Sequence, residues 1–107
     1  MTAPTTGEQA TAERMLAELH EHGYVDRPEF KGLKPGDRVK HRGEQYPEAY
    51  DQGTATVWAV VEKPDSAWSR KYHASDVELI VVRDRPFAEG MSRVTSWANY
   101  HTEAVVR

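Results

Sequence analysis

The chain has 107 residues, of which 38% are hydrophobic and 29% charged, and its formal net charge is −3 at pH 7. This length predicts one domain, and the lack of cysteine excludes disulfides, thiolate metal sites and a cysteine nucleophile. The negative charge disfavours nonspecific DNA binding, and no apolar run approaches the roughly 18 residues of a membrane span.

The chain opens with a Thr-, Pro- and Gly-rich segment, residues 1–7, which predicts a disordered leader. A helix is expected over residues 8–22. Thr5 and Glu8 have the spacing of a capping box, and Gly23 is placed to end the helix. The apolar positions recur at helical spacing in one narrow stripe, made of Ala12, Met15, Leu16 and Leu19. Four apolar residues are too few to stabilise an isolated helix in water. We therefore expect this helix to dock on the rest of the chain or on a partner.

After an extended linker at residues 24–28, a turn is expected at residues 34–37, because Pro35 and Gly36 have the φ preferences of its two central positions. Turn residues then separate several β-rich runs, which cover residues 38–42, 54–63 and 77–83 and one or two short strands within 92–106.

The run at 77–83 is the most apolar of these strands. Its alternation places one set of side chains, Val77, Leu79 and Val81, on one face, and Ile80 and Val82 on the other. We therefore expect both faces of this strand to be covered. Near the end of the chain, Trp97 and Tyr100 are expected in the core or at a barrel end.

Strands separated by turn signals, with one helix in front and no βαβ alternation, predict an α+β fold. The expected architecture is a small SH3-like β-barrel or half-barrel of about five antiparallel strands with an N-terminal helix. The expected divisions are a disordered leader (1–7), a helix and linker (8–32) and the barrel domain (33–107).

Two stretches carry a resemblance to a family. The sequence GDRVKH at residues 36–41, followed by GTATV at residues 53–57, resembles the GDxVxH and GxGxV opening of SH3-like or Tudor-like barrels. Such barrels occur at the C-terminal tails of superfamily 1 DNA repair helicases and in bacterial proteins that bind RNA polymerase. Residues 36–105 also resemble small uncharacterised proteins encoded by phages of actinobacteria, which implies an origin and no activity.

Candidate catalytic and metal-binding groups are few. Ser69 with His73, and Ser96 with His101, could pair a nucleophile with a base, but neither lies in a nucleophile elbow or beside a Gly-rich oxyanion loop. His101 and Glu103 would share a strand face, but no other close pair completes a four-ligand site. We therefore expect a non-enzymatic protein with no metal and no cofactor.

The strongest candidate for a binding surface is the expected loop at residues 67–75. It interleaves aromatic and cationic side chains: Trp68, Arg70, Lys71 and Tyr72. These residue types are enriched at protein interfaces, and they also stack on bases and meet phosphates. A third interpretation is that Trp68 folds back and closes an end of the barrel.

A second candidate is the polar loop at residues 43–52, in which Tyr46 and Tyr50 flank a Pro-Glu-Ala segment. Loop tyrosines of signalling SH3 domains grip proline-rich peptides. The alternative is that one tyrosine packs on the barrel and the other is solvated.

The leading functional hypothesis is a non-enzymatic protein-binding module, a small phage-encoded adaptor or host-interaction protein whose partner is another protein. The alternatives are a virion structural protein that decorates or connects capsid or tail subunits, and a nucleic-acid-binding barrel. Residues 36–107 carry 10 Lys/Arg against 11 Asp/Glu, which makes duplex DNA an unlikely ligand. The expected location is the host cytoplasm, with the virion as the alternative; the pattern specifies no oligomeric state.

Overall fold

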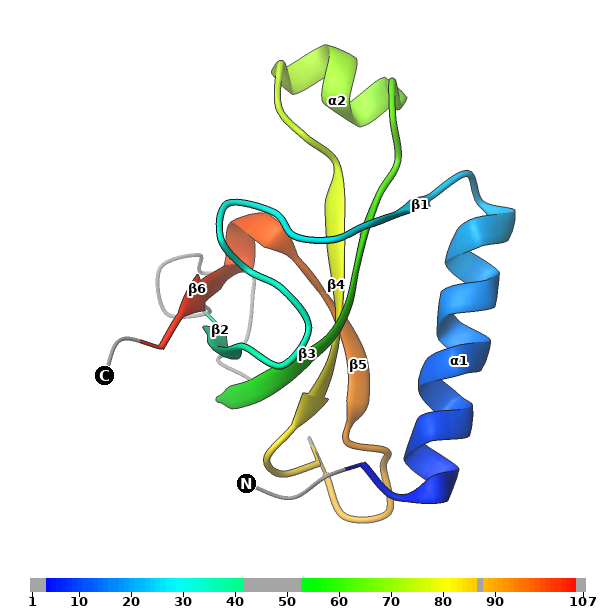
Figure 1. The fold of residues 1–107 in the computed structure, drawn as a ribbon, viewed down its shortest axis with the longest axis vertical. Coiled ribbons are helices and arrows are strands. Elements are labelled where there is room, and N and C mark those ends of the chain that lie inside the picture. Colours follow the sequence, from blue (N-terminus) through cyan, green and yellow to red (C-terminus); the bar gives the residue numbers. More distant parts are fainter. Residues whose placement is uncertain (1–3, 42–52, 87, 106–107) are drawn as a thin grey trace.

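The computed structural model describes residues 4–41, 53–86 and 88–105 of the chain. One N-terminal helix lies against a six-stranded antiparallel sheet that curls into an open half-barrel (Figure 1). The elements in chain order are α1 (Thr6–Glu21), β1 (Val25–Arg27), β2 (Arg38–His41), β3 (Thr54–Glu62), α2 (Ala67–Tyr72), β4 (Val77–Arg83), β5 (Val94–Ala98), the 3-10 helix η2 (Asn99–His101) and β6 (Thr102–Ala104). The predicted α+β fold class is confirmed, with six strands where about five were expected.

The first helix has the caps that its sequence predicts, although it begins two residues before the expected residue 8 and ends one residue before the expected residue 22. The Thr5 side chain accepts a hydrogen bond from the backbone N–H of Glu8, and the Glu8 carboxylate accepts one from the backbone N–H of Thr5. This reciprocal pair is the capping box, and it satisfies backbone donors that the first turn leaves open. At the other end Gly23 takes a φ of 93°, which a residue with a side chain rarely adopts. The helix therefore ends at Glu21.

The sheet is organised around its longest strand, β3. The strand order is β5-β4-β3-β2-β6, and β1 also pairs with β3. The segment expected to be an extended linker is thus a sheet strand, in which Val25 lies opposite Glu62 and Arg27 opposite Val60. The register of β3 against β4 shifts between Val57 and Ala59, so the extra residue, Trp58, bulges from the ladder.

The turn before β2 has the predicted geometry. Gly36 has a φ of 95°, and the backbone N–H of Asp37 donates to the carbonyl of Lys34 over 3.0 Å. The chain then enters β2 with Val39 and His41 both buried, as their shared face predicts. This turn positions β2 between β3 and β6.

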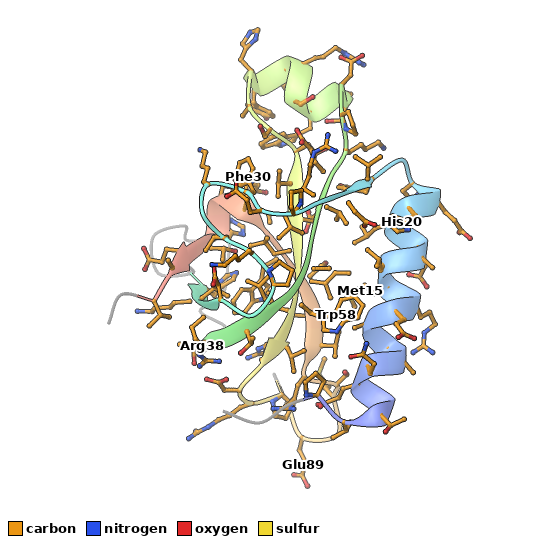
Figure 2. All side chains as sticks on the ribbon, in the orientation of Figure 1. Met15, His20, Phe30, Arg38, Trp58 and Glu89 are labelled. Carbon is orange, nitrogen blue, oxygen red and sulfur yellow. The ribbon has the colours of Figure 1, made fainter. Side chains whose placement is uncertain are left out.

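The strand β4 is buried on both faces, as predicted. One apolar cluster fills the inside of the half-barrel, and its members are Leu33, Val39, Ala55, Val57, Val60, Val77, Leu79, Val81 and Trp97. The other lies between sheet and helix, where Ala12, Ile80, Val82 and Val94 are buried and Met15, Leu16, Leu19, Trp58 and Ala59 pack against them. Figure 2 shows Met15 of α1 and Trp58 of β3 lying side by side between helix and sheet. The helix α1, which was predicted to dock on the rest of the chain or on a partner, therefore docks on the sheet.

The structure also corrects two expectations. Residues 67–75 were expected to be a loop, but residues 67–72 form the short helix α2. Tyr100 was expected in the core or at a barrel end, but it is 42% exposed, whereas Trp97 is 2% exposed as predicted. The reason is that β5 ends at Ala98 and η2 begins at Asn99, which breaks the strand alternation before Tyr100.

We predict that Leu79→Ala and Ile80→Ala each lower the free energy of unfolding by about 2–5 kcal/mol, the usual range for truncating a buried aliphatic side chain. Both residues are fully buried, but they belong to different clusters. Urea unfolding of the two variants checks this. A cost below about 1 kcal/mol for Ile80→Ala would show that the helix is an appendage whose contact with the sheet contributes little.

An ion pair also joins the helix α1 to the sheet. Arg93 is the residue before β5, and its guanidinium donates hydrogen bonds to both carboxylate oxygens of Glu8, over 2.6 and 2.7 Å. Both side chains are largely shielded, at 18% and 15% exposure. These hydrogen bonds lower the pKa of Glu8 to about 2.

Because the pKa of Glu8 is lowered by folding, its stabilising contribution is present above the unfolded pKa of about 4.5 and is lost as pH falls toward 2. We predict that Glu8→Gln, which keeps a capping-box side chain, destabilises the protein by about 1–3 kcal/mol at pH 7. This difference should shrink toward zero near pH 2. The exposed Glu18→Gln is the control, and a pH-independent difference in urea unfolding would contradict the assignment.

Candidate binding site

The helix α2 forms because of local sequence after β3. Pro64 cannot donate to a ladder, and the Ser66 side chain then accepts a hydrogen bond from the backbone N–H of Ser69 over 2.9 Å as an N-cap. His73 ends the helix in the left-handed region at φ 53°. The six-residue helix projects from one end of the sheet, between β3 and β4 (Figure 1).

Three aromatic side chains gather where α2 meets η2. The rings of Trp68 and Tyr100 are stacked, with centroids 5.7 Å apart and planes 13° from parallel, and the Tyr72 ring lies 5.2 Å from Trp68. Tyr72 is 56% and Tyr100 42% exposed, and Trp68 is half-buried and belongs to neither apolar cluster. We call these three residues the aromatic patch.

Hydrogen bonds anchor the 3-10 helix η2, which carries Tyr100 of the aromatic patch, to the sheet. The Asn99 side-chain amide donates to the backbone carbonyls of Ser75 and Val77, over 3.3 and 3.2 Å, which fastens η2 to the start of β4. A surface whose backbone is already anchored in this way loses less conformational entropy when it binds a partner.

The predicted site residues fall into three groups. Trp68 and Tyr72 lie in the aromatic patch. The cations lie beside it: the Arg70 guanidinium is 3.2 Å from the Asp65 carboxylate, and the Lys71 ammonium is 5.3 Å from the centre of the Tyr72 ring. Tyr46 and Tyr50 lie outside the described residues. Tyr100 was missed as a surface residue because its sequence context favours the core.

The stack of Trp68 on Tyr100 stands between two open clefts, both of which it lines together with Asn99. The larger, about 760 Å³, extends toward Phe30 and Lys31. The smaller, about 220 Å³, is also lined by the polar side chains of Tyr24, Asp76 and Glu78. We call this smaller cleft the acidic pocket.

In the larger cleft the acidic groups are already neutralised. The Glu62 carboxylate is 2.9 Å from the Arg27 guanidinium, and Asp65 is paired with Arg70. Lys31 lies on the rim with its ammonium 5.4 Å from the centre of the Phe30 ring.

In the acidic pocket the carboxyl group of Glu78 is perturbed. Burial, and then the nearby Asp76 carboxylate, raise the pKa of Glu78 to about 7. Burial, the charges of Asp76 and Glu78 and a hydrogen bond with Asp76 raise the pKa of Tyr24 to about 12. Sequence reasoning missed this pair, although the alternation of β4 places Glu78 on the same face as Ile80, where a charge is out of place.

Ser69, one of the two candidate catalytic serines, has a structural role in the cap of α2. The Ser69 hydroxyl donates to the backbone carbonyl of Ser66 over 2.9 Å within the helix cap. His101 instead takes part in ring contacts, with its centroid 4.4 Å from Tyr100 and 5.4 Å from His41.

Across residues 4–41, 53–86 and 88–105, no three His, Asp or Glu side chains gather where they could hold a metal ion. Within those same ranges, no helix is long and apolar enough to cross a membrane.

Comparison of the chain with protein-family models, with curated proteins and with solved structures finds no match in any of the three.

We predict that Glu78→Gln stabilises the protein at alkaline pH. A carboxyl whose pKa is raised by folding favours the folded state below its unfolded pKa of about 4.5, and this contribution is lost as pH rises through about 7. At pH 8 the variant should therefore gain about 1–3 kcal/mol over the wild type, by removing a half-buried charge. At pH 4 the two should unfold alike.

The matched control for this prediction is Glu89→Gln, since Glu89 is an exposed glutamate at the far end of the molecule from α2 (Figure 2). Thermal unfolding followed by circular dichroism checks both variants. A Glu78→Gln protein that is less stable than the wild type at pH 8 would show that the ionised carboxylate is favourably paired in the folded state.

Proposed function

We propose that the protein is a non-enzymatic binding module that holds a segment of another protein across the aromatic patch. The observation that carries this proposal is the stack of Trp68 on Tyr100, which stands outside both apolar clusters and between two clefts. Tryptophan and tyrosine are the residues most enriched at the energetic centres of protein interfaces, and they act there by filling or flanking pockets.

The shape of the surface supports a peptide segment as the ligand. Because Trp68 and Tyr100 line both clefts, an extended chain that lies across the stack can place one side chain in each cleft. Both clefts are open, so a segment can enter and leave without rearrangement of the sheet.

Charge favours a protein over a nucleic acid as the partner. Among the described residues, four arginines lie in ion pairs with carboxylates: Arg27, Arg38, Arg70 and Arg93. An arginine already paired with a carboxylate contributes little to the counterion release that drives binding to phosphates. The carboxyl groups of Asp76 and Glu78 in the acidic pocket would repel a phosphate backbone that approached the aromatic patch from that side.

The particular form of the proposal is an adaptor encoded by a phage and acting in the host cytoplasm. This form is supported by the resemblance of residues 36–105 to small phage proteins.

Selection of peptides from a displayed random library against the wild-type protein tests the proposal. Trp68→Ala should weaken the selected peptides by about thirtyfold or more, the effect of losing about 2 kcal/mol of binding energy. Met91→Ala is the matched control, because Met91 is 56% exposed but lies outside the site.

Peptides that bind Trp68→Ala and the wild type equally well would place the binding surface elsewhere. Salt-dependent binding of duplex DNA tighter than about 1 μM at physiological salt would favour the nucleic-acid hypothesis instead, since ordinary nonspecific affinity is weaker.

A further inference from the structure

The acidic pocket is lined by both carboxyl and aromatic side chains. It combines two carboxyl groups, three aromatic rings and a side-chain amide, from Asp76, Glu78, Tyr24, Trp68, Tyr100 and Asn99. Its volume of about 220 Å³ is several times the roughly 30 Å³ that a water molecule occupies in the liquid. It can therefore accept the end of a long side chain.

We propose that the acidic pocket binds a basic side chain of the partner segment, and that it prefers the guanidinium of arginine to the ammonium of lysine. This inference rests on the proposed function, because the pocket shares its aromatic wall with the binding surface.

The first argument is charge complementarity. Asp76 is hydrogen-bonded to the hydroxyl of Tyr24, whereas within the described part of the chain the carboxyl group of Glu78 meets only burial and the neighbouring Asp76 charge, with no hydrogen bond or ion pair. The Lys63 ammonium lies 6.0 Å from the centre of the Tyr24 ring and forms no ion pair with Asp76 or Glu78. A half-buried carboxylate without a counter-ion is costly, and a cation supplied by a ligand would remove that cost.

The aromatic wall of the pocket also favours a basic side chain. A cation near an aromatic ring is attracted by the electron density of the ring face, and arginine enters such contacts more often than lysine. A guanidinium is planar, is weakly hydrated and carries donors in a fork that matches a carboxylate. The combination of Trp68 and Tyr100 with Glu78 therefore favours arginine.

The position of Glu78 at the end of β4 leaves its carboxyl group within reach of a ligand. The carboxyl lies at the end of the face of β4 that α1 covers, opposite Ala98 of the edge strand β5, where the pocket opens. The strand thus places the charge at the boundary between the apolar layer and solvent, which a ligand can reach.

The test is a titration of ¹⁵N-labelled full-length protein with N-acetyl-arginine amide, followed by NMR. The expected result is a saturable shift of the Trp68 indole N–H and the Asn99 side-chain amide, with a dissociation constant in the millimolar range typical of so small a ligand. The same compound made from citrulline, which has the shape of arginine but no charge, should give no saturable shift. The lysine compound should bind several-fold more weakly than the arginine compound.

Glu78→Gln should weaken the arginine compound at least tenfold, while Glu89→Gln should leave its affinity unchanged. The spectrum of each variant shows whether it is folded. Equal binding of the citrulline compound, or unchanged binding to Glu78→Gln, would overturn the inference. So would the absence of any saturable shift in the wild type.

The outcome can be separated from that of the proposed function. If the arginine compound fails to bind but the selected peptides still require Trp68, the binding module stands and the arginine pocket does not. If the inference is right, the peptides selected on the wild type should be enriched in arginine, and those selected on Glu78→Gln should lose this enrichment.

Discussion

The constraint on which the rest of the structure depends is that β4 must be covered on both faces. Leu79 faces the inside of the half-barrel and Ile80 faces the helix, and each is fully buried. An open sheet of this size could bury only one face, so the helix α1 is required by the alternation of a single strand. The bulge at Trp58 serves the same end, because it turns a large ring out of the ladder toward Met15.

Helix α1 does not cover the first residues of β4. The candidate site lies at that uncovered end of the strand. Glu78 lies on the face that α1 covers, but at the end where the apolar layer gives way to the aromatic patch. A carboxyl raised in pKa by burial and an exposed stack of aromatic rings both work against stability and solubility. Features that reduce stability without a structural gain are typical of functional sites, and here two of them share one pocket.

Much of the fold could be predicted because its signals are local. The capping box of Thr5, the turn at Gly36 and the two-sided alternation around Leu79 each depend on residues only a few positions apart. The short helix α2 was missed although its N-cap, Ser66, is visible in the sequence, because six residues carry too little periodicity to stand out from a loop. The pairing of residues 25–27 with β3 was missed because it depends on contacts distant in sequence.

The candidate site was predictable only in part, for the same reason. The interleaved aromatic and cationic residues of α2 indicated where binding could occur, and Trp68 lies at its centre. Tyr100 and Glu78 join it only because η2 and β4 converge on α2, which no short window of sequence reveals.

The account depends most directly on the claim that the stack of Trp68 on Tyr100 lies outside the core and forms part of a binding surface. Urea unfolding of Trp68→Ala beside Trp97→Ala measures this. The account predicts a loss of no more than about 1.5 kcal/mol for Trp68→Ala, the value of one aromatic pair, and about 3–5 kcal/mol for Trp97→Ala, which is 2% exposed. Equal losses for the two variants would show that Trp68 closes the end of the half-barrel, and would contradict the account.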